Sequence, residues 1–277
     1  MFNLLKNKKR FVVTAMSVIL LSSFLVSPSV SEASWSFNSL PWVVKIKSAL
    51  TRTRINSSFN NSLTAGLVGV WSFDGPDMLN GTVFDRSGQG NNMYFVNMAT
   101  STALTIGKVG QGLYFDTGID YLEGEDVSTF DFGTGDFSVS LWFKTPFAGV
   151  GARMISTRTI CANDSFWEVN VGSGRFIPCI DEPGGNLACV AGVATVNDDE
   201  WHHGVFTRSG LDLISYIDGA QDDTATASIL IDLTNNAPLR IGDSVCNNDY
   251  VGNIDEVRVY NRKLSVEEVK RLYSMAR

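Results

Sequence analysis

The sequence has very little histidine and lacks the short motifs that mark many catalytic and metal centres. Only two histidines occur among 277 residues, His202 and His203, and they are adjacent. A metal centre built from histidines at dispersed positions is therefore excluded. The four cysteines form no C-x-x-C pair, which argues against a zinc ribbon or a dithiol redox motif. The sequence contains no G-x-S-x-G, the signature of a serine nucleophile on an elbow turn.

Positive charge and long helix-forming runs are also scarce. The chain has 22 Lys and Arg against 29 Asp and Glu, a formal net charge of -7. The net field therefore does not favour nucleic acid or an anionic membrane as a partner. The 25 glycines and the shortage of helical runs favour an all-β fold, and a chain that is 44% hydrophobic can bury a sizeable core.

The N-terminus has the pattern of a signal peptide over residues 1–33. Its apolar core, residues 11–26, is short for a membrane span, and small residues at Ser31 and Ala33 fit cleavage after Ala33. We therefore expect a secreted or cell-surface protein, with an uncleaved membrane anchor as the alternative. The basic residues that precede the apolar core are Lys6, Lys8, Lys9 and Arg10.

The cysteines fit an exported protein, because disulfides persist in oxidising compartments. Residues 182–186, "EPGGN", are predicted to form a hairpin loop, and its register places Cys179 opposite Cys189, within reach of a disulfide. That pairing leaves Cys161 with Cys246 as a second disulfide. The alternative is that all four are thiols.

Beyond an Asn- and Ser-rich extension at residues 34–65, the chain alternates strands and turns from residue 66 to 277. Apolar residues alternate in 67–73 and 137–143, and 201–219 predicts two strands joined by a tight turn. Many short strands with turn residues between them indicate a sandwich or barrel.

A single helix is predicted at the C-terminus. Ser265 and Glu268 form the sequence pattern of a capping box, and Leu264 with Val269 fits a hydrophobic staple. Apolar residues then recur at helical spacing. This helix is expected to pack back on the sandwich.

A set of motifs occurs in the order typical of one large family. They are "GLVGVWSFDG", "DRSGQGNN", "GKVGQGLYFDTGIDYLEG", "GDFSVSLWFKT", "DDEWHHGVFTRSG", "YIDG" and "GNIDEVRVYNRKLSVEEVKRLY". Residues 66–277 resemble the bacterial laminin G-like (LamG-like) jelly-roll domains of the concanavalin A-like lectin/glucanase superfamily. The resemblance implies two antiparallel sheets and, often, a structural calcium ion. It does not imply one function, because this fold hosts lectins, glycosidases, lyases and adhesion modules.

Asp255 raises a question about charge compensation. Strict alternation along "GNIDEVRVYNR" puts Asp255 on the same face as the apolar Val257 and Val259, at the edge of the core. A buried carboxylate needs a compensating partner. The candidates are a cation, water, or an arginine, either Arg86 or Arg240.

We predict calcium as that partner. Asp74 and Asp255 lie near the two ends of the domain sequence, and terminal strands of jelly rolls commonly lie side by side. The loop 87–92 adds carbonyl oxygens and the side chain of Asn91 or Asn92, and calcium takes six to eight oxygen ligands. The predicted side-chain ligands are Asp74, Asn91 and Asp255. The alternative is that Asp74 only caps a turn.

The histidine pair does not predict catalysis. Neighbouring strand residues point to opposite faces, so His202 and His203 cannot readily act together. His203 shares its face with Trp201 and Val205 and is expected to be a hydrogen-bonded structural residue. No strand carries the closely spaced carboxylates that retaining glycosidases need, so no catalytic residues are predicted.

A binding face is predicted at one end of the sandwich. Aromatic, amide and charged groups suit sugars, which present C–H patches and hydroxyls. The alternative is that the tryptophan is core and the Asn and Asp residues only form turns. The predicted ligand-binding residues are Trp167, Arg175, Asn247, Asn248 and Tyr250.

These observations lead to one predicted function and two alternatives. We expect an exported, non-catalytic module that binds carbohydrate or glycoconjugate at the cell surface with a structural calcium ion. The first alternative is a structural or adhesion protein that binds other proteins. The second is a divergent polysaccharide hydrolase or lyase.

Overall fold

The structure is a computed structural model, and it describes residues 62–98, 103–116, 119–126, 128–149, 151–158, 160–161, 164–242 and 250–276. The predicted signal peptide and most of the 34–65 extension lie outside the described residues. So do three residues assigned to sites from the sequence, Cys246, Asn247 and Asn248.

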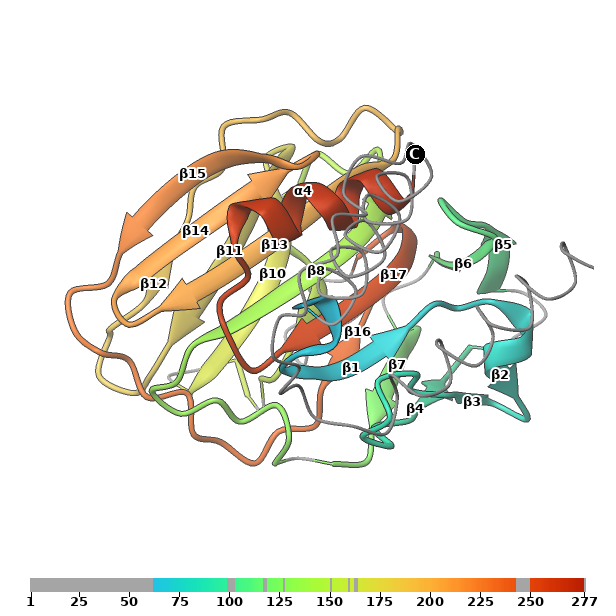
Figure 1. Ribbon diagram of the computed structural model, residues 1–277, viewed down its shortest axis with the longest axis horizontal. Coiled ribbons are helices and arrows are strands. Elements are labelled where there is room, and N and C mark those ends of the chain that lie inside the picture. Colours follow the sequence, from blue (N-terminus) through green and yellow to red (C-terminus); the bar gives the residue numbers. More distant parts are fainter. Residues whose placement is uncertain are drawn as a thin grey trace, which may run out of the picture. The chain divides into compact units, whose positions relative to one another are not determined.

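Two antiparallel β-sheets form a sandwich (Figure 1). Sheet A has the strand order β15-β14-β13-β8-β17-β6-β5, with β1 paired to β17 beside this path. Its strands are β1 (Leu67–Trp71), β5 (Leu104–Ile106), β6 (Gln111–Phe115), β8 (Phe137–Lys144), β13 (His202–Ser209), β14 (Asp212–Ile217), β15 (Ala220–Thr226) and β17 (Gly252–Tyr260).

Sheet B has the strand order β12-β11-β10-β9-β16-β7-β4-β3-β2. Its strands are β2 (Met78–Leu79), β3 (Thr82–Val83), β4 (Met93–Val96), β7 (Tyr121–Gly124), β9 (Ala152–Ser156), β10 (Phe166–Gly172), β11 (Arg175–Asp181), β12 (Ala188–Cys189) and β16 (Arg240–Ile241). A short 3-10 helix, η1 (Gly75–Asp77), follows β1. The predicted all-β sandwich is confirmed.

The core lies between the two sheets and is built by alternation along the strands. In β8, Phe137, Val139, Leu141 and Phe143 are fully buried in one apolar cluster, as the sequence predicts. In β10, Val169 belongs to the same cluster from the opposite sheet. Each sheet therefore turns its second face away from the core.

The outer face of sheet A is covered in part by the helix α4 (Val266–Met275) (Figure 1). Ser265 caps α4 with the predicted capping box, accepting from the backbone N–H of Glu268 while the Glu268 side chain accepts from the backbone N–H of Ser265. Val269 and Leu272 pack with Tyr260 in a second apolar cluster. In the part of the chain that the structure describes, no helix is long and apolar enough to cross a membrane.

A β-bulge in β17 changes the predicted face of Asp255. The register shifts between Asp255 and Arg258, and Glu256 has a φ of 52°. The extra residue puts Ile254 and Val257 on the core side together. Asp255, opposite Trp142, therefore lies on the outer face of sheet A, and its predicted placement beside Val257 is wrong.

Candidate binding site

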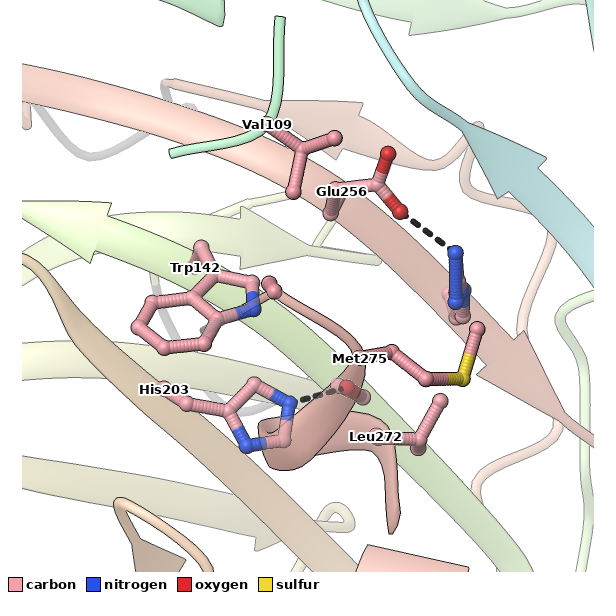
Figure 2. A pocket seen from close by; sticks show the side chains of 9 residues that line it. Val109, Trp142, His203, Glu256, Leu272 and Met275 are labelled. Carbon is pink, nitrogen blue, oxygen red and sulfur yellow. Dashed lines mark hydrogen bonds and ion pairs between the residues drawn. The ribbon is translucent and has the colours of Figure 1, made fainter. Parts of the chain in front are cut away.

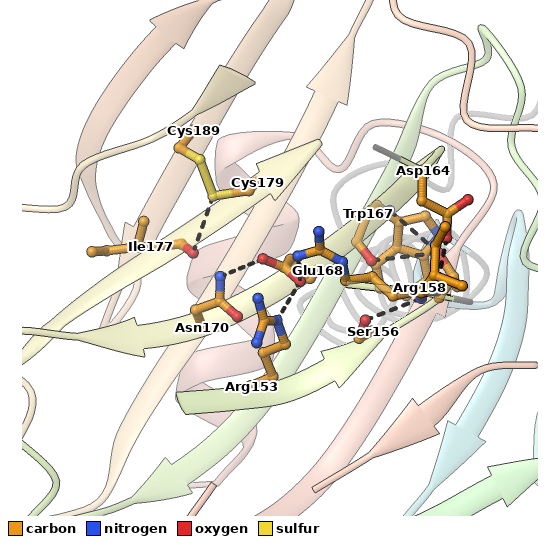
Figure 3. Close-up of polar contacts among 12 residues, drawn as sticks. Arg153, Ser156, Arg158, Asp164, Trp167, Glu168, Asn170, Ile177, Cys179 and Cys189 are labelled. Atoms are coloured by element: carbon orange, nitrogen blue, oxygen red, sulfur yellow. Dashed lines mark hydrogen bonds and ion pairs between the residues drawn. A yellow bond between two sulfur atoms is a disulfide. The ribbon is translucent and has the colours of Figure 1, made fainter. Parts of the chain in front are cut away.

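A buried polar cluster lies on the face of sheet B that turns away from the core. Val169 and Val171 of β10 belong to the core, so alternation turns Glu168 and Asn170 outward. The sheet register pairs Asn170 with Arg153 of the neighbouring strand β9. These three polar side chains therefore lie on one face, in two adjacent strands (Figure 3).

Glu168 is the centre of this cluster. Its Oε2 accepts from Arg153 Nε at 2.6 Å and from Arg158 Nη1 at 3.3 Å. Its Oε1 accepts from Asn170 Nδ2 at 2.9 Å. The Arg153 and Glu168 side chains are only 9% and 4% exposed, so these groups are held in fixed positions away from bulk water.

Three atoms of the cluster have hydrogen-bonding capacity that the described residues do not use. Asn170 Oδ1, Arg153 Nη1 and Arg158 Nε are buried and have no partner among them. Buried polar atoms are nearly always hydrogen-bonded, and leaving one unsatisfied costs about 1–3 kcal/mol. One acceptor and one donor on directly paired residues are thus left for a partner other than the described residues.

The sequence carried a signal for this cluster. Arg153 stands in "ARMIS" and Glu168 in "FWEVNV", so each is a charged residue inside an apolar strand. The strand pairing that brings them together is visible only in the fold, where a register shift between Val169 and Asn170 sets Arg153 opposite Asn170. Neither arginine of the cluster was among the predicted site residues.

Asp74 and Asp255, two of the predicted calcium ligands, contact one loop. Asp74 Oδ1 accepts from the backbone N–H of Gln111 at 2.9 Å, and Asp255 Oδ2 accepts from that of Val109 at 2.9 Å. Glycine is required in this loop, since a Cβ at Gly110 would lie 2.2 Å from Asp74 Oδ1. The two carboxylates therefore converge on residues 107–111, not on the predicted loop 87–92.

Asn91, the third predicted ligand, lies elsewhere. Its side chain donates to the backbone oxygen of Val68, and its backbone N–H donates to Asp85 Oδ2. The indole Nε1 of Trp71 also donates to the backbone oxygen of Asn91. Among the described residues, the hydrogen bonds of Asn91 are therefore with Val68, Trp71 and Asp85, and not with the loop 107–111. In the described part of the chain no three His, Cys, Asp or Glu side chains form a metal-binding group.

Among the described residues, the hydrogen bonds to Asp255 come from backbone N–H groups and not from an arginine. Its Oδ1 accepts from the backbone N–H of Glu256 at 2.8 Å, in addition to the bond from Val109. Arg86 and Arg240, the two arginines considered as partners, pair instead with Asp77 and Glu123. Burial raises the pKa of Asp255 to about 7, against the opposing effect of the backbone hydrogen bond from Val109.

The sequence of this sandwich matches one family model. That model, described as the concanavalin A-like lectin/glucanases superfamily, covers residues 116–270. The chain belongs to this superfamily. A search of curated proteins finds no match.

Solved structures with the superfamily's jelly-roll fold include carbohydrate complexes. Domain 4 of AbnA, an extracellular arabinanase from Geobacillus stearothermophilus solved with arabinotriose, has a TM-score of 0.61 and 19% identity over 76% of this chain and 98% of that chain. The binding domain of botulinum neurotoxin DC, solved with SialylT, has a TM-score of 0.59 and 11% identity over 77% of this chain and 52% of that one.

A third similar structure is also a binding domain. The binding domain of Paraclostridial Mosquitocidal Protein 1 has a TM-score of 0.64 and 17% identity over 77% of this chain and 53% of that chain. The present chain therefore spans about half the length of the two toxin domains. At these identities the similarity concerns the fold.

Two of the predicted ligand-binding residues, Trp167 and Tyr250, belong to the hydrophobic core. Trp167 is 0% exposed, and its Nε1 donates to the backbone oxygen of Phe130 at 2.9 Å. Tyr250 is also 0% exposed, and its hydroxyl lies 3.0 Å from the backbone oxygen of Lys144. Their predicted role as an exposed aromatic face is wrong, because each fills the interior and bonds the backbone there.

Arg175 is exposed and lies on the same outward face of sheet B as the polar cluster, but its guanidinium bonds the backbone elsewhere. Its guanidinium donates to the backbone oxygens of Gly192 and Val193. Asn170 of the cluster is the register partner of Ile177, two residues from Arg175 in β11. Arg175 thus lies at the margin of the cluster and makes none of the hydrogen bonds described within it. The remaining predicted ligand residues, Asn247 and Asn248, lie outside the described residues.

One predicted disulfide is present. Cys179 and Cys189 are register partners in β11 and β12, and their sulfur atoms are bonded. The predicted hairpin around "EPGGN" produces this pairing. The second predicted disulfide, between Cys161 and Cys246, stays a prediction because Cys246 lies outside the described residues.

The adjacent histidines point to different partners, as alternation predicts. His203 is 1% exposed, and its Nε2 lies 2.9 Å from Ser140 Oγ. Nδ1 of His202 lies 2.9 Å from Asp218 Oδ2, and Nε2 of His202 lies 3.1 Å from Asp198 Oδ1. The structural role expected for His203 is confirmed in its burial and hydrogen bond.

Proposed function

We propose that this domain is a non-catalytic binding module for carbohydrate or glycoconjugate. Its site is the polar cluster on the outer face of sheet B, around Arg153, Glu168 and Asn170. In this proposal Glu168 fixes the two polar side chains, and Asn170 Oδ1 and Arg153 Nη1 contact sugar hydroxyls.

The single observation that carries the proposal is the buried, partly unsatisfied network. A charged pair that only stabilised the sheet would have its hydrogen-bonding atoms satisfied within the protein. Here a donor and an acceptor remain without partners among the described residues. A ligand with hydroxyl groups can supply both partners, because each hydroxyl both donates and accepts.

The superfamily comparison supports the same class of ligand. The similar domain of the arabinanase was solved with arabinotriose, and the similar toxin domain with SialylT. Those ligands belong to those proteins. The fold is thus compatible with sugar binding, and the residues that would perform it here are this chain's own.

Calcium and export complete the proposal. Asp74 and Asp255 fit a calcium site, because both carboxylates reach the loop 107–111, which also offers backbone oxygens. A bound ion would supply positive charge beside the buried Asp255 carboxylate. Residues 1–33 would direct export, which the disulfide between Cys179 and Cys189 favours.

A glycan array with the full chain tests the proposal. We expect specific binding to a subset of glycans and at least tenfold weaker binding by Asn170→Ser. The matched control is Asn186→Ser, which changes an asparagine in the loop between β11 and β12 and should leave binding unchanged. An array with no binding by folded protein would contradict the proposal and favour adhesion to other proteins.

A further inference from the structure

Two neighbouring cavities lie on the outer face of sheet A, remote from the polar cluster on sheet B. The first, of about 190 Å³, is lined by residues that include Trp142, His203 and Glu256 (Figure 2). The second, of about 400 Å³, lies between α4, β1 and β17, and we call it the β1 cavity. Arg258 and Met275 line both, so they separate the two spaces.

The β1 cavity has the size and the walls of a small-molecule site. Ligand pockets in proteins usually enclose roughly 300–1,000 Å³ and are mainly apolar, with a few polar groups that orient the ligand. The apolar wall here consists of Leu63, Leu67, Val70 and Met275. Met275 is 60% exposed at the end of α4, so the cavity opens to solvent beside a flexible side chain.

The charged groups on the polar side of the β1 cavity are hydrogen-bond donors, beside the hydroxyl of Thr64. Both charged side chains that line it are guanidinium groups, Arg258 and Arg271. The carboxylate that pairs with Arg258 belongs to Glu256, which lines the smaller cavity (Figure 2). Arg258 is thus held in place from one side, and its guanidinium also lines the β1 cavity.

Tyr260 adds a donor that has no partner. The residue is 0% exposed and lines the β1 cavity, and its hydroxyl has no hydrogen-bond partner among the described residues. Burial raises the pKa of Tyr260 to about 12, so the phenol keeps its proton and donates it. The cavity therefore has an unused donor beside two guanidinium groups.

We propose that the β1 cavity binds a small organic carboxylate with an aliphatic body. The carboxylate oxygens would accept from the Tyr260 hydroxyl and from the guanidinium groups of Arg258 and Arg271. The aliphatic body would lie against Leu63, Leu67 and Val70. Charge-assisted hydrogen bonds from arginine are about twice as strong as neutral ones, so the charge of the ligand decides its affinity.

This class of ligand follows from the lining and not from the sugar site. A free sugar presents hydroxyls on most sides and would leave them unpaired against the leucine and valine wall. A fully apolar molecule would leave the buried Tyr260 hydroxyl without an acceptor. An aliphatic carboxylate satisfies both sides of the cavity.

The proposal is tested by calorimetric titration of the full chain with octanoate. The octanoate concentration is kept below the critical micelle concentration of octanoate. We expect saturable binding, with 1-octanol at least tenfold weaker because it lacks the charge. Arg271→Gln should weaken octanoate binding at least tenfold, and Tyr260→Phe about threefold or more. The matched control is Lys270→Gln on the same helix, an exposed residue outside the cavity lining, which should bind as the parent does.

A second measurement separates lost binding from lost folding. The carboxyl carbon of ¹³C-labelled octanoate should shift in its NMR signal on binding to the parent and to Tyr260→Phe at saturating concentration. The proposal is overturned if folded parent protein does not bind octanoate, or if 1-octanol binds as tightly. It is also overturned if Lys270→Gln loses as much affinity as Arg271→Gln.

Discussion

Arg153 and Glu168 form an ion pair on the outer face of sheet B, with Arg153 Nε 2.6 Å from Glu168 Oε2. Sheet faces that turn outward usually carry solvated charges, whereas this pair is almost completely buried. Removing one partner of such a pair leaves an uncompensated charge out of water. The pair therefore makes Glu168 important for stability as well as for the proposed binding.

Glu168→Gln should destabilise the domain by about 3 kcal/mol, the lower end of what breaking a buried ion pair costs. Two guanidinium groups, those of Arg153 and Arg158, lose their shared carboxylate. Urea unfolding followed by tryptophan fluorescence measures the change in the free energy of unfolding.

The matched control for this variant is Glu123→Gln on the same sheet. Glu123 pairs with Arg240, but these side chains are 33% and 20% exposed, so solvent screens the interaction. We expect the free energy of unfolding to change by less than about 1 kcal/mol. An equal loss of unfolding free energy in Glu123→Gln and Glu168→Gln would show that burial does not make the Arg153–Glu168 pair more stabilising than the exposed pair.

The disulfide between Cys179 and Cys189 should stabilise the domain through its short loop. The two residues are 10 positions apart, and closing a loop of that length in the unfolded chain stabilises the folded state by about 3 kcal/mol. The double variant Cys179→Ser with Cys189→Ser should unfold at correspondingly lower urea. A reductant should lower the stability of the parent by a similar amount and leave the double variant unchanged, unless the predicted Cys161–Cys246 bond also forms.

Much of the fold follows from the sequence because alternation and turn residues act locally. The strand 137–143, the hairpin at "EPGGN" and the capping box at Ser265 are each defined within a few residues, and the structure has all three. The failures occur where a β-bulge changes the alternation. The register shift between Asp255 and Arg258 moves Asp255 to the other face, and one between Leu67 and Gly69 separates Leu67 from Trp71.

The binding site was less predictable than the fold, for a different physical reason. Trp167 and Glu168 are neighbours in sequence, and alternation puts one in the core and the other outside it. Composition cannot tell which of two adjacent residues faces the core when both strand faces are buried. Arg153 reaches Glu168 only through pairing of β9 with β10, which depends on the whole sheet.

Calcium, in the proposal, should raise the melting temperature of the parent protein, because a ligand that binds only the folded state stabilises it. Asp255→Asn and Asp74→Asn should each abolish this rise. Asn91→Ala should lower the melting temperature by removing the hydrogen bond to Val68, yet keep the response to calcium. A melting temperature insensitive to both calcium and chelator would argue against the ion, and loss of the response in Asn91→Ala would favour the predicted three-residue set.

His202 should make stability depend on pH above its unfolded pKa of about 6.5. The hydrogen bond to Asp218 raises the pKa of His202, burial opposes it, and the hydrogen bond to Asp198 raises it further. The charged form is therefore stabilised by folding. This stabilisation is complete below the unfolded value of about 6.5 and is lost as the pH rises through the higher folded value. Thermal melts across this range should decline with pH in the parent and decline less in His202→Gln.

His203 should make the stability of the protein fall as the pH becomes acidic, opposite in direction to the effect of His202. Burial lowers the pKa of His203 to about 3, so the folded protein keeps this imidazole neutral where the unfolded chain protonates it. The contribution of neutral His203 to the free energy of unfolding is complete above the unfolded pKa of about 6.5. It is lost as the pH falls towards the folded pKa of about 3, and the loss is about 2 kcal/mol at about pH 5.

His203→Gln tests this dependence, because glutamine keeps a polar group near Ser140 without titrating. The variant should be less stable than the parent near pH 8, since it loses the ring contacts with Trp142 and Tyr273. Its acid-side decline should nevertheless be shallower. His202→Gln is the matched control on the adjacent residue and should keep the full acid-side decline. Parallel declines in the parent and in His203→Gln would show that His203 is protonated in the folded state, contrary to its burial against the two aromatic rings.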